Sequence, residues 1–137
     1  MLAIDLGARR IGVAVSDKAR TIAFVRPAIL RSGDADRDRT AIVSVAADHD
    51  VTTVVVGLPL SLDGREGRAA TAARQEAAAL QSCLETTGVQ VTVCDERFTT
   101  VTASRSLREA GKPARKARAS VDSAAAAVLL QAWLEQG

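Results

Sequence analysis

The chain has 137 residues, 47% of them hydrophobic and 2% aromatic, and a net charge of +2. This length is enough for one domain with its own core, residues 1–137, and too short for a two-domain enzyme. The scarcity of aromatic rings argues against a protein that binds single strands by stacking bases on aromatic side chains.

The first part of the chain predicts three strands. Two apolar, partly β-branched runs, residues 2–6 and 11–16, are separated by Gly-Ala-Arg-Arg and indicate an antiparallel hairpin. Residues 21–30 supply a third strand, which should lie at a sheet edge because it contains Pro27.

The middle of the chain alternates helices and strands. Residues 34–50 predict a helix with an apolar stripe at Ala35, Ile42, Val45 and Ala46. Residues 51–56 are β-branched throughout and predict a strand buried on both faces. Residues 64–88 predict an alanine-rich helix that ends at Gly88, with its apolar stripe at Ala69, Ala73, Ala77, Leu80 and Leu84.

The last part predicts one more strand and two helices. Residues 89–93 alternate as a strand does, residues 100–110 predict a basic helix, and residues 112–119 a charged linker containing Pro113. Residues 121–136 predict the final helix. The order βββαβαβαα indicates an α/β fold, a mixed five-stranded sheet with helices on both faces and the first strand at its centre.

The cysteines and the single histidine offer little chemistry. Cys83 and Cys94 have no metal-binding or redox spacing, so we expect buried thiols. His49 alone cannot build a histidine metal centre or a nucleophilic triad. No apolar run is long enough to span a membrane and no cleavable leader precedes Leu2, so we expect a cytoplasmic protein without membrane contact.

Positive charge is concentrated late in the chain. Residues 97–118 hold seven basic residues and one acid, Glu109. This segment carries +6, which leaves −4 elsewhere and favours a polyanionic partner. The alternative is a solvated surface without a partner.

Acidic residues stand at three suggestive positions. Asp5 lies inside a predicted strand, where an ionised group is costly without a cation or strong donors. Asp95 and Glu96 directly follow another strand, and because side chains alternate, only one of them can share a face with Asp5. Asp122 lies in the first turn of the predicted last helix, where the helix dipole alone could explain an acid.

In the predicted sheet the first and fifth strands end at one rim, and a helix across the sheet can bring Asp122 there. Converging carboxylates with no His or Cys nearby suit Mg²⁺ or Mn²⁺. Two such ions about 3.5–4 Å apart would activate water and stabilise both the attacking and the leaving oxygen of a phosphodiester.

Four ordered segments then resemble a known family. DLGARRIGVAVSD from Asp5, VGLPLSLDG from Val56, DERFTT from Asp95 and SVDSAA from Ser120 resemble the signatures of the YqgF/RuvX family. These small RNase H-like proteins are described as Holliday junction resolvases or pre-16S ribosomal RNA nucleases. The resemblance implies an RNase H-like fold and a catalytic, metal-binding triad of Asp5, Glu96 and Asp122. It leaves Asp95 as a helper that could orient Arg97.

Several basic residues are candidates for substrate contact. Arg9 and Arg10 lie at the predicted hairpin tip, and Arg97 could clamp a phosphate or pair with a neighbouring acid. Four cations flank Pro113 in a predicted loop suited to closing over a nucleic-acid backbone: Lys112, Arg115, Lys116 and Arg118.

The leading hypothesis is a metal-dependent nuclease, a hydrolase acting on ester bonds in structured RNA or branched DNA. The resemblance favours 5′-end processing of pre-16S rRNA. One alternative is a Holliday junction resolvase, which would need a homodimer, with Trp133 as a candidate contact. Another is a nucleic-acid-binding assembly protein whose acids are vestigial. An actin-like ATPase would need a second domain.

Overall fold

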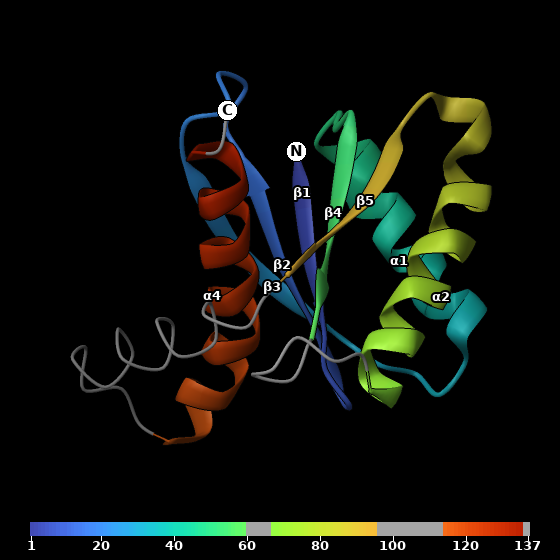
Figure 1. Cartoon of the computed structure of the whole chain (residues 1–137). Helices are drawn as coiled ribbons and strands as arrows, with labels where there is room; N and C mark the ends of the chain where they lie inside the picture. The colour runs from blue at the N-terminus through green and yellow to red at the C-terminus, as the bar shows by residue number, and fades with distance from the viewer. Residues whose placement is uncertain (60–66, 96–113, 136–137) are drawn as a thin grey trace.

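The computed structural model describes residues 1–59, 67–95 and 114–135, with the side chains of the last helix described from Ser123 onward. A single sheet is covered by α4 on one face and by α1 and α2 on the other (Figure 1). The strands are β1 (Leu2–Leu6), β2 (Arg10–Ser16), β3 (Ala23–Leu30), β4 (Thr53–Leu58) and β5 (Gln90–Asp95). The α-helices are α1 (Ala35–Asp48), α2 (Arg68–Leu84) and α4 (Ala114–Glu135), with a short 3-10 turn, η1 (Glu85–Thr87), after α2.

The strands lie in the order β3-β2-β1-β4-β5, which confirms the mixed five-stranded sheet with β1 at its centre. β1 is antiparallel to β2 and parallel to β4, and β4 is parallel to β5. The carboxyl ends of β1, β4 and β5 therefore share one edge of the sheet, and Figure 1 shows the amino-terminal end of α4 at that same edge.

Each face of the sheet has its own core. Toward α1 and α2 the sheet presents side chains such as Leu2, Ile4 and Val56, which pack against Leu80 and Leu84 of α2. The opposite face presents small residues, which pack against α4 in a cluster of Ala3, Ala14, Val55, Ala126, Leu129 and Leu130. The small side chains on this face allow α4 to lie close to β1 and β2.

The third strand occupies the sheet edge, as Pro27 predicted. The β2–β3 register shifts between Ile11 and Val13, opposite the part of β3 that contains Pro27. A proline lacks the N–H that a regular ladder position needs, so it fits this irregularity.

Two details of the predicted helix stripes were wrong. In α1 Ala35 is exposed and Asp38 is buried, because the Asp38 carboxylate accepts hydrogen bonds from the Ser32 backbone N–H and hydroxyl. In α2 Ala70 is buried where Ala69 was expected. The helix begins at Arg68 rather than at residue 64, and its buried side chains follow the repeat Ala70, Ala73, Ala77, Leu80 and Leu84.

The cysteine prediction was wrong for Cys83, which is exposed, while Cys94 is half-buried. Cys83 is on α2 but outside the residues that this helix buries, so its burial was not implied by the helical repeat.

The predicted linker of residues 112–119 was also wrong, since α4 begins at Ala114. Ala, Arg and Lys are strong helix formers, and a proline just before the first turn is compatible with a helix start. The predicted helix of residues 100–110 lies outside the described residues.

Candidate functional site

Asp5 is the described acid with the most informative position. It lies one residue before the end of the central strand, is half-buried and pairs across the ladder with Gly12 of β2. Side chains on a strand alternate, so Asp5 shares a face with Ala3, which packs in the cluster against α4. Asp5 therefore points to the face that α4 covers.

Glycines flank Asp5 on both neighbouring strands. Gly12 is its registered partner on β2, and on β4 the partner of Ile4 is Val56, so Gly57 follows at the level of Asp5. Neither glycine places a side chain on the face beside the carboxylate. On the α4 side of the sheet the immediate cross-strand neighbours of Asp5 are therefore backbone alone, although both glycines are buried.

Asp95 lies on the opposite face from Asp5. Val91 and Val93 of β5 pack in the cluster toward α1 and α2, while Cys94 packs against the α4 cluster. By alternation Asp95 returns to the side of Val93, and it is exposed. This separates Asp95 from Asp5. Glu96 lies outside the described residues, so the expectation that only one of Asp95 and Glu96 shares the face of Asp5 stays a prediction.

The helix α4 contributes to the same face. It runs opposite to β1 (Figure 1), and Ala126 packs in one cluster with Ala3. Moving from Ala126 toward the helix start therefore approaches the carboxyl end of β1, where Asp5 lies. Position 122 is one turn before Ala126; α4 includes Asp122, whose side chain lies outside the described part.

Ser123 is a polar group that sequence reasoning missed. It is 2% exposed, and its Oγ has no hydrogen-bond partner in the structure. Three residues of helix before Ala126 span about 4.5 Å, and two residues of strand from Ala3 to Asp5 span about 6.6 Å, so Ser123 approaches the level of Asp5. A buried hydroxyl without a partner costs stability, which makes it a candidate for a functional contact.

The hairpin cations are placed differently from each other. Arg9 is exposed in the turn between β1 and β2, and Arg10 is half-buried opposite Leu30 of β3. The turn is closed by the Gly7 N–H, which donates to the Arg10 carbonyl at 2.9 Å.

Of the later cations, Arg97 and Lys112 lie outside the described residues, and Arg115, Lys116 and Arg118 belong to the first turns of α4 rather than to a loop. A helix fixes their spacing along one axis, in contrast to the predicted loop that could close over a nucleic-acid backbone. Their side chains are also outside the described part.

Asp17, which ends the first signature segment, stabilises a turn after β2. Its carboxylate accepts hydrogen bonds from the backbone N–H groups of Ile22 and Thr21 and from the Thr21 hydroxyl. The Ile22 N–H is the largest cause, followed by Thr21, that lowers the pKa of Asp17. Asp17 lies at the end of the sheet away from Asp5 and serves the fold.

The described residues contain neither a cluster of metal-binding side chains nor a helix that could span a membrane. Within residues 1–59, 67–95 and 123–135, no three His, Cys, Asp or Glu side chains are grouped closely enough to hold a metal ion. No helix in the described part is both long and apolar enough to cross a membrane.

Comparison with known proteins gives consistent matches over nearly the whole chain. A family model, RuvX Holliday junction resolvase, matches residues 1–136. Proteins named "Putative pre-16S rRNA nuclease" are similar: that of Anaeromyxobacter dehalogenans strain 2CP-C is 45% identical over 98% of this chain and 96% of its own length. That of Myxococcus xanthus is 43% identical over 98% of this chain and 86% of its own length.

Two solved structures share the fold. Thermus thermophilus RuvC in complex with a Holliday junction has a TM-score of 0.52 at 16% identity, covering 93% of each chain. The yeast mitochondrial resolvase Ydc2 has a TM-score of 0.57 at 9% identity, covering 97% of this chain and 76% of its own. The expected RNase H-like α/β fold is thereby confirmed.

Proposed function

The chain belongs to the RuvX Holliday junction resolvase family, and we propose that it cleaves structured nucleic acid with divalent ions held by Asp5, Glu96 and Asp122. Its family and its relatives make it a nuclease, a hydrolase of nucleic-acid ester bonds. The identity of the metal, the residues that hold it and the substrate are what we propose.

The observation that carries this proposal is the position of Asp5. Asp5 is an ionisable side chain on the central strand, half-buried on the face that α4 covers and level with Gly12 and Gly57. Burying a carboxylate is costly unless a cation or strong donors accompany it. A carboxylate between two glycines, at the edge where three strands end, favours a ligand-binding role.

The donor set fits Mg²⁺ or Mn²⁺. Carboxylate oxygens are the ligands of these hard cations, and the orphaned Ser123 hydroxyl on the same face offers a donor to a metal-ligating carboxylate. Glu96 follows Asp95, so continued alternation would return it to the face of Asp5; Asp122 precedes Ser123 on α4. We propose that two ions bind there, and bound ions supply Lewis-acid stabilisation of charge on a phosphodiester.

The other candidate residues would act on the substrate backbone. In this proposal Arg97 holds the phosphate that is cut, and Arg9, Arg10, Lys112, Arg115, Lys116 and Arg118 contact flanking phosphates. Such contacts position the strand and carry no sequence information.

We propose precursor 16S rRNA as the substrate, because relatives with more than 40% identity carry that name. This substrate implies action in the cytoplasm. Junction cleavage is the second candidate and is favoured by the shared fold with RuvC, whose structure holds a Holliday junction. Resolution of a junction would require two sites at a fixed separation, hence a homodimer.

The test replaces Asp5 with Asn and Glu96 with Gln and measures cleavage of a precursor rRNA 5′ end and of a four-way DNA junction, with Mg²⁺ or Mn²⁺. Both variants should lose at least a hundredfold in rate. Asp48→Asn is the matched control and should retain activity, because Asp48 is exposed at the end of α1, on the other side of the sheet from Asp5. Undiminished turnover by folded Asp5→Asn would contradict the proposal, and tight binding without any metal-dependent cleavage would favour an assembly protein.

A further inference from the structure

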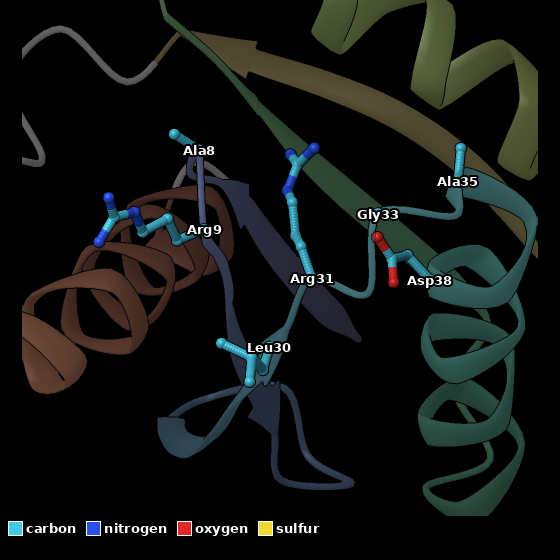
Figure 2. A pocket seen from close by; sticks show the side chains of 7 residues that line it. All are labelled: Ala8, Arg9, Leu30, Arg31, Gly33, Ala35 and Asp38. Atoms are coloured by element: carbon cyan, nitrogen blue, oxygen red, sulfur yellow. The ribbon is translucent and has the colours of Figure 1, made fainter.

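Two cavities adjoin at the turn of the β1–β2 hairpin. One, of about 560 Å³, lies between the hairpin turn and the loop that leads into α1 (Figure 2). The other, of about 450 Å³, lies between the end of β1 and the facing sides of α1 and α2. Ala8 and Arg31 line both cavities, so we treat them as one feature and call it the hairpin groove.

The backbone around Arg31 is fixed on both sides. The Arg31 N–H donates to the Arg9 carbonyl at 2.9 Å, which joins it to the hairpin turn. On the other side, the Ser32 backbone N–H and hydroxyl donate to the Asp38 carboxylate at 3.0 and 2.8 Å. A long cationic side chain thus extends from an anchored backbone, which reduces the entropy lost when it binds a ligand.

The acids that line the hairpin groove are already engaged. Asp38 accepts from Ser32, and Glu76 receives the Arg39 guanidinium at 2.8 Å, which also contacts Asp36. Arg31 forms no ion pair within the described part of the chain. Figure 2 shows its side chain extending between Ala8 and Ala35, away from the Asp38 carboxylate.

The rest of the lining is small and mostly apolar. Besides Arg31 and the engaged ion pair, the second cavity presents Leu6, Gly7, Gln75 and the alanines Ala8, Ala69, Ala72 and Ala73. These side chains offer few donors or acceptors for base edges. A guanidinium in such surroundings suits a phosphate group and gives no direct base readout.

We propose that the hairpin groove binds a backbone phosphate of the nucleic-acid substrate through Arg31, next to the cleavage site. This inference rests on the proposed function and names a further contact of that site. Ala8, which lines the groove beside Arg31, is three residues after Asp5 and thus at most about 10 Å away along the chain, a distance that a few phosphates of one strand cover. The groove opens toward α1 and α2 and Asp5 faces α4, so the strand would pass over the hairpin turn. A strand crossing the hairpin turn can therefore reach both residues.

The test measures binding without cleavage, by fluorescence anisotropy of a labelled RNA hairpin and of a labelled four-way DNA junction, in EDTA over about 50 to 200 mM salt. The variants are Arg31→Gln and Arg31→Lys. The matched control is Arg26→Gln, an exposed arginine on β3, the strand that precedes Arg31, and it lines neither cavity. Thermal melts establish that each variant is folded.

Arg31→Gln should bind roughly tenfold more weakly at low salt. Its plot of log affinity against log salt should be shallower by about 0.7 to 0.9, the signature of one lost phosphate contact. Arg31→Lys should keep the wild-type slope, and Arg26→Gln should keep both affinity and slope. The probe that shows the effect identifies whether RNA or branched DNA supplies the phosphate.

The proposal would be overturned if Arg31→Gln bound both probes with the affinity and salt slope of the wild type. It would also be overturned if Arg26→Gln lost as much affinity as Arg31→Gln, or if the wild type showed no salt-dependent binding. Binding is measured without metal, so it does not depend on cleavage. If the wild type failed to cleave either substrate, the proposed nuclease site would be contradicted, but the binding of Arg31→Gln would still test the hairpin groove.

Discussion

Replacing Ser123 with Ala should make the protein more stable. The Ser123 Oγ is buried without a hydrogen-bond partner in the structure, at 2% exposure of the residue. Removing a buried, unsatisfied hydroxyl should recover about 1–2 kcal/mol of unfolding free energy. The better helix propensity of alanine adds about 0.5 kcal/mol.

Ser44→Ala is the matched control, since Ser44 is exposed in the middle of α1 and reports helix propensity alone. For a chain of this size 1 kcal/mol corresponds to about 3–4 °C in Tm. We therefore expect Tm to rise by roughly 5–8 °C in Ser123→Ala and by about 2 °C in Ser44→Ala. Thermal melts without metal measure both, and a Ser123→Ala Tm at or below that of Ser44→Ala would refute the reasoning.

A second readout connects Ser123 to the proposed site. Titration with Mn²⁺ alone should raise the Tm of the wild type, because a ligand that binds only the folded state stabilises it. Ser123→Ala should show a smaller rise if the hydroxyl supports a metal-ligating carboxylate, so the variant would be more stable and bind the ion more weakly. An Mn²⁺ response equal to that of the wild type would assign the hydroxyl no part in ion binding.

Two further predictions concern other residues. The pKa of Asp38 is lowered by hydrogen bonds from Ser32, first from its backbone N–H and then from its hydroxyl. The ionised carboxylate therefore stabilises the fold above the unfolded pKa of about 4. This stabilisation is lost as the pH falls through the pKa that Asp38 has in the folded protein. Asp38→Asn should therefore flatten the fall in unfolding free energy below about pH 4, as measured by denaturant titrations at several pH values; an unchanged slope would contradict the role of Ser32. Gly57→Ala adds a methyl group at a buried position of β4 level with Asp5, so it should lower Tm through overpacking and reduce cleavage at least tenfold, since misplacing a substrate by about 1 Å can cost a hundredfold in rate; full activity in the folded variant would mean that the position beside Asp5 is not used.

Much of the fold was predictable because its strands carry clear signals. The run of β-branched residues in β4 and the glycine-separated hairpin of β1 and β2 both indicated their elements, and Pro27 correctly indicated an edge. The start of α4 was missed because Pro113 and the dense charge suggested a linker, although alanine, arginine and lysine favour a helix.

The site was predictable only in part. Asp5 stood out since a carboxylate inside an apolar strand is costly, and its face followed from alternation. Ser123 and Arg31 were missed because a serine in an alanine-rich helix and an arginine after a strand are ordinary in sequence. Their significance comes from tertiary packing, which buries the Ser123 hydroxyl and anchors the backbone of Arg31 between the hairpin and α1.

The alternation along β1 has a consequence for how this strand can change in evolution. Leu2 and Ile4 supply packing on one side, while Ala3 and Asp5 serve the α4 side. Inserting or deleting a single residue before Asp5 would turn its carboxylate toward the aliphatic core under α1 and α2. It would also turn Leu2 or Ile4 toward α4, where the sheet has small side chains. Length variation among homologues should therefore be confined to loops such as residues 17–22, and β1 should tolerate only substitutions that respect its two-residue repeat.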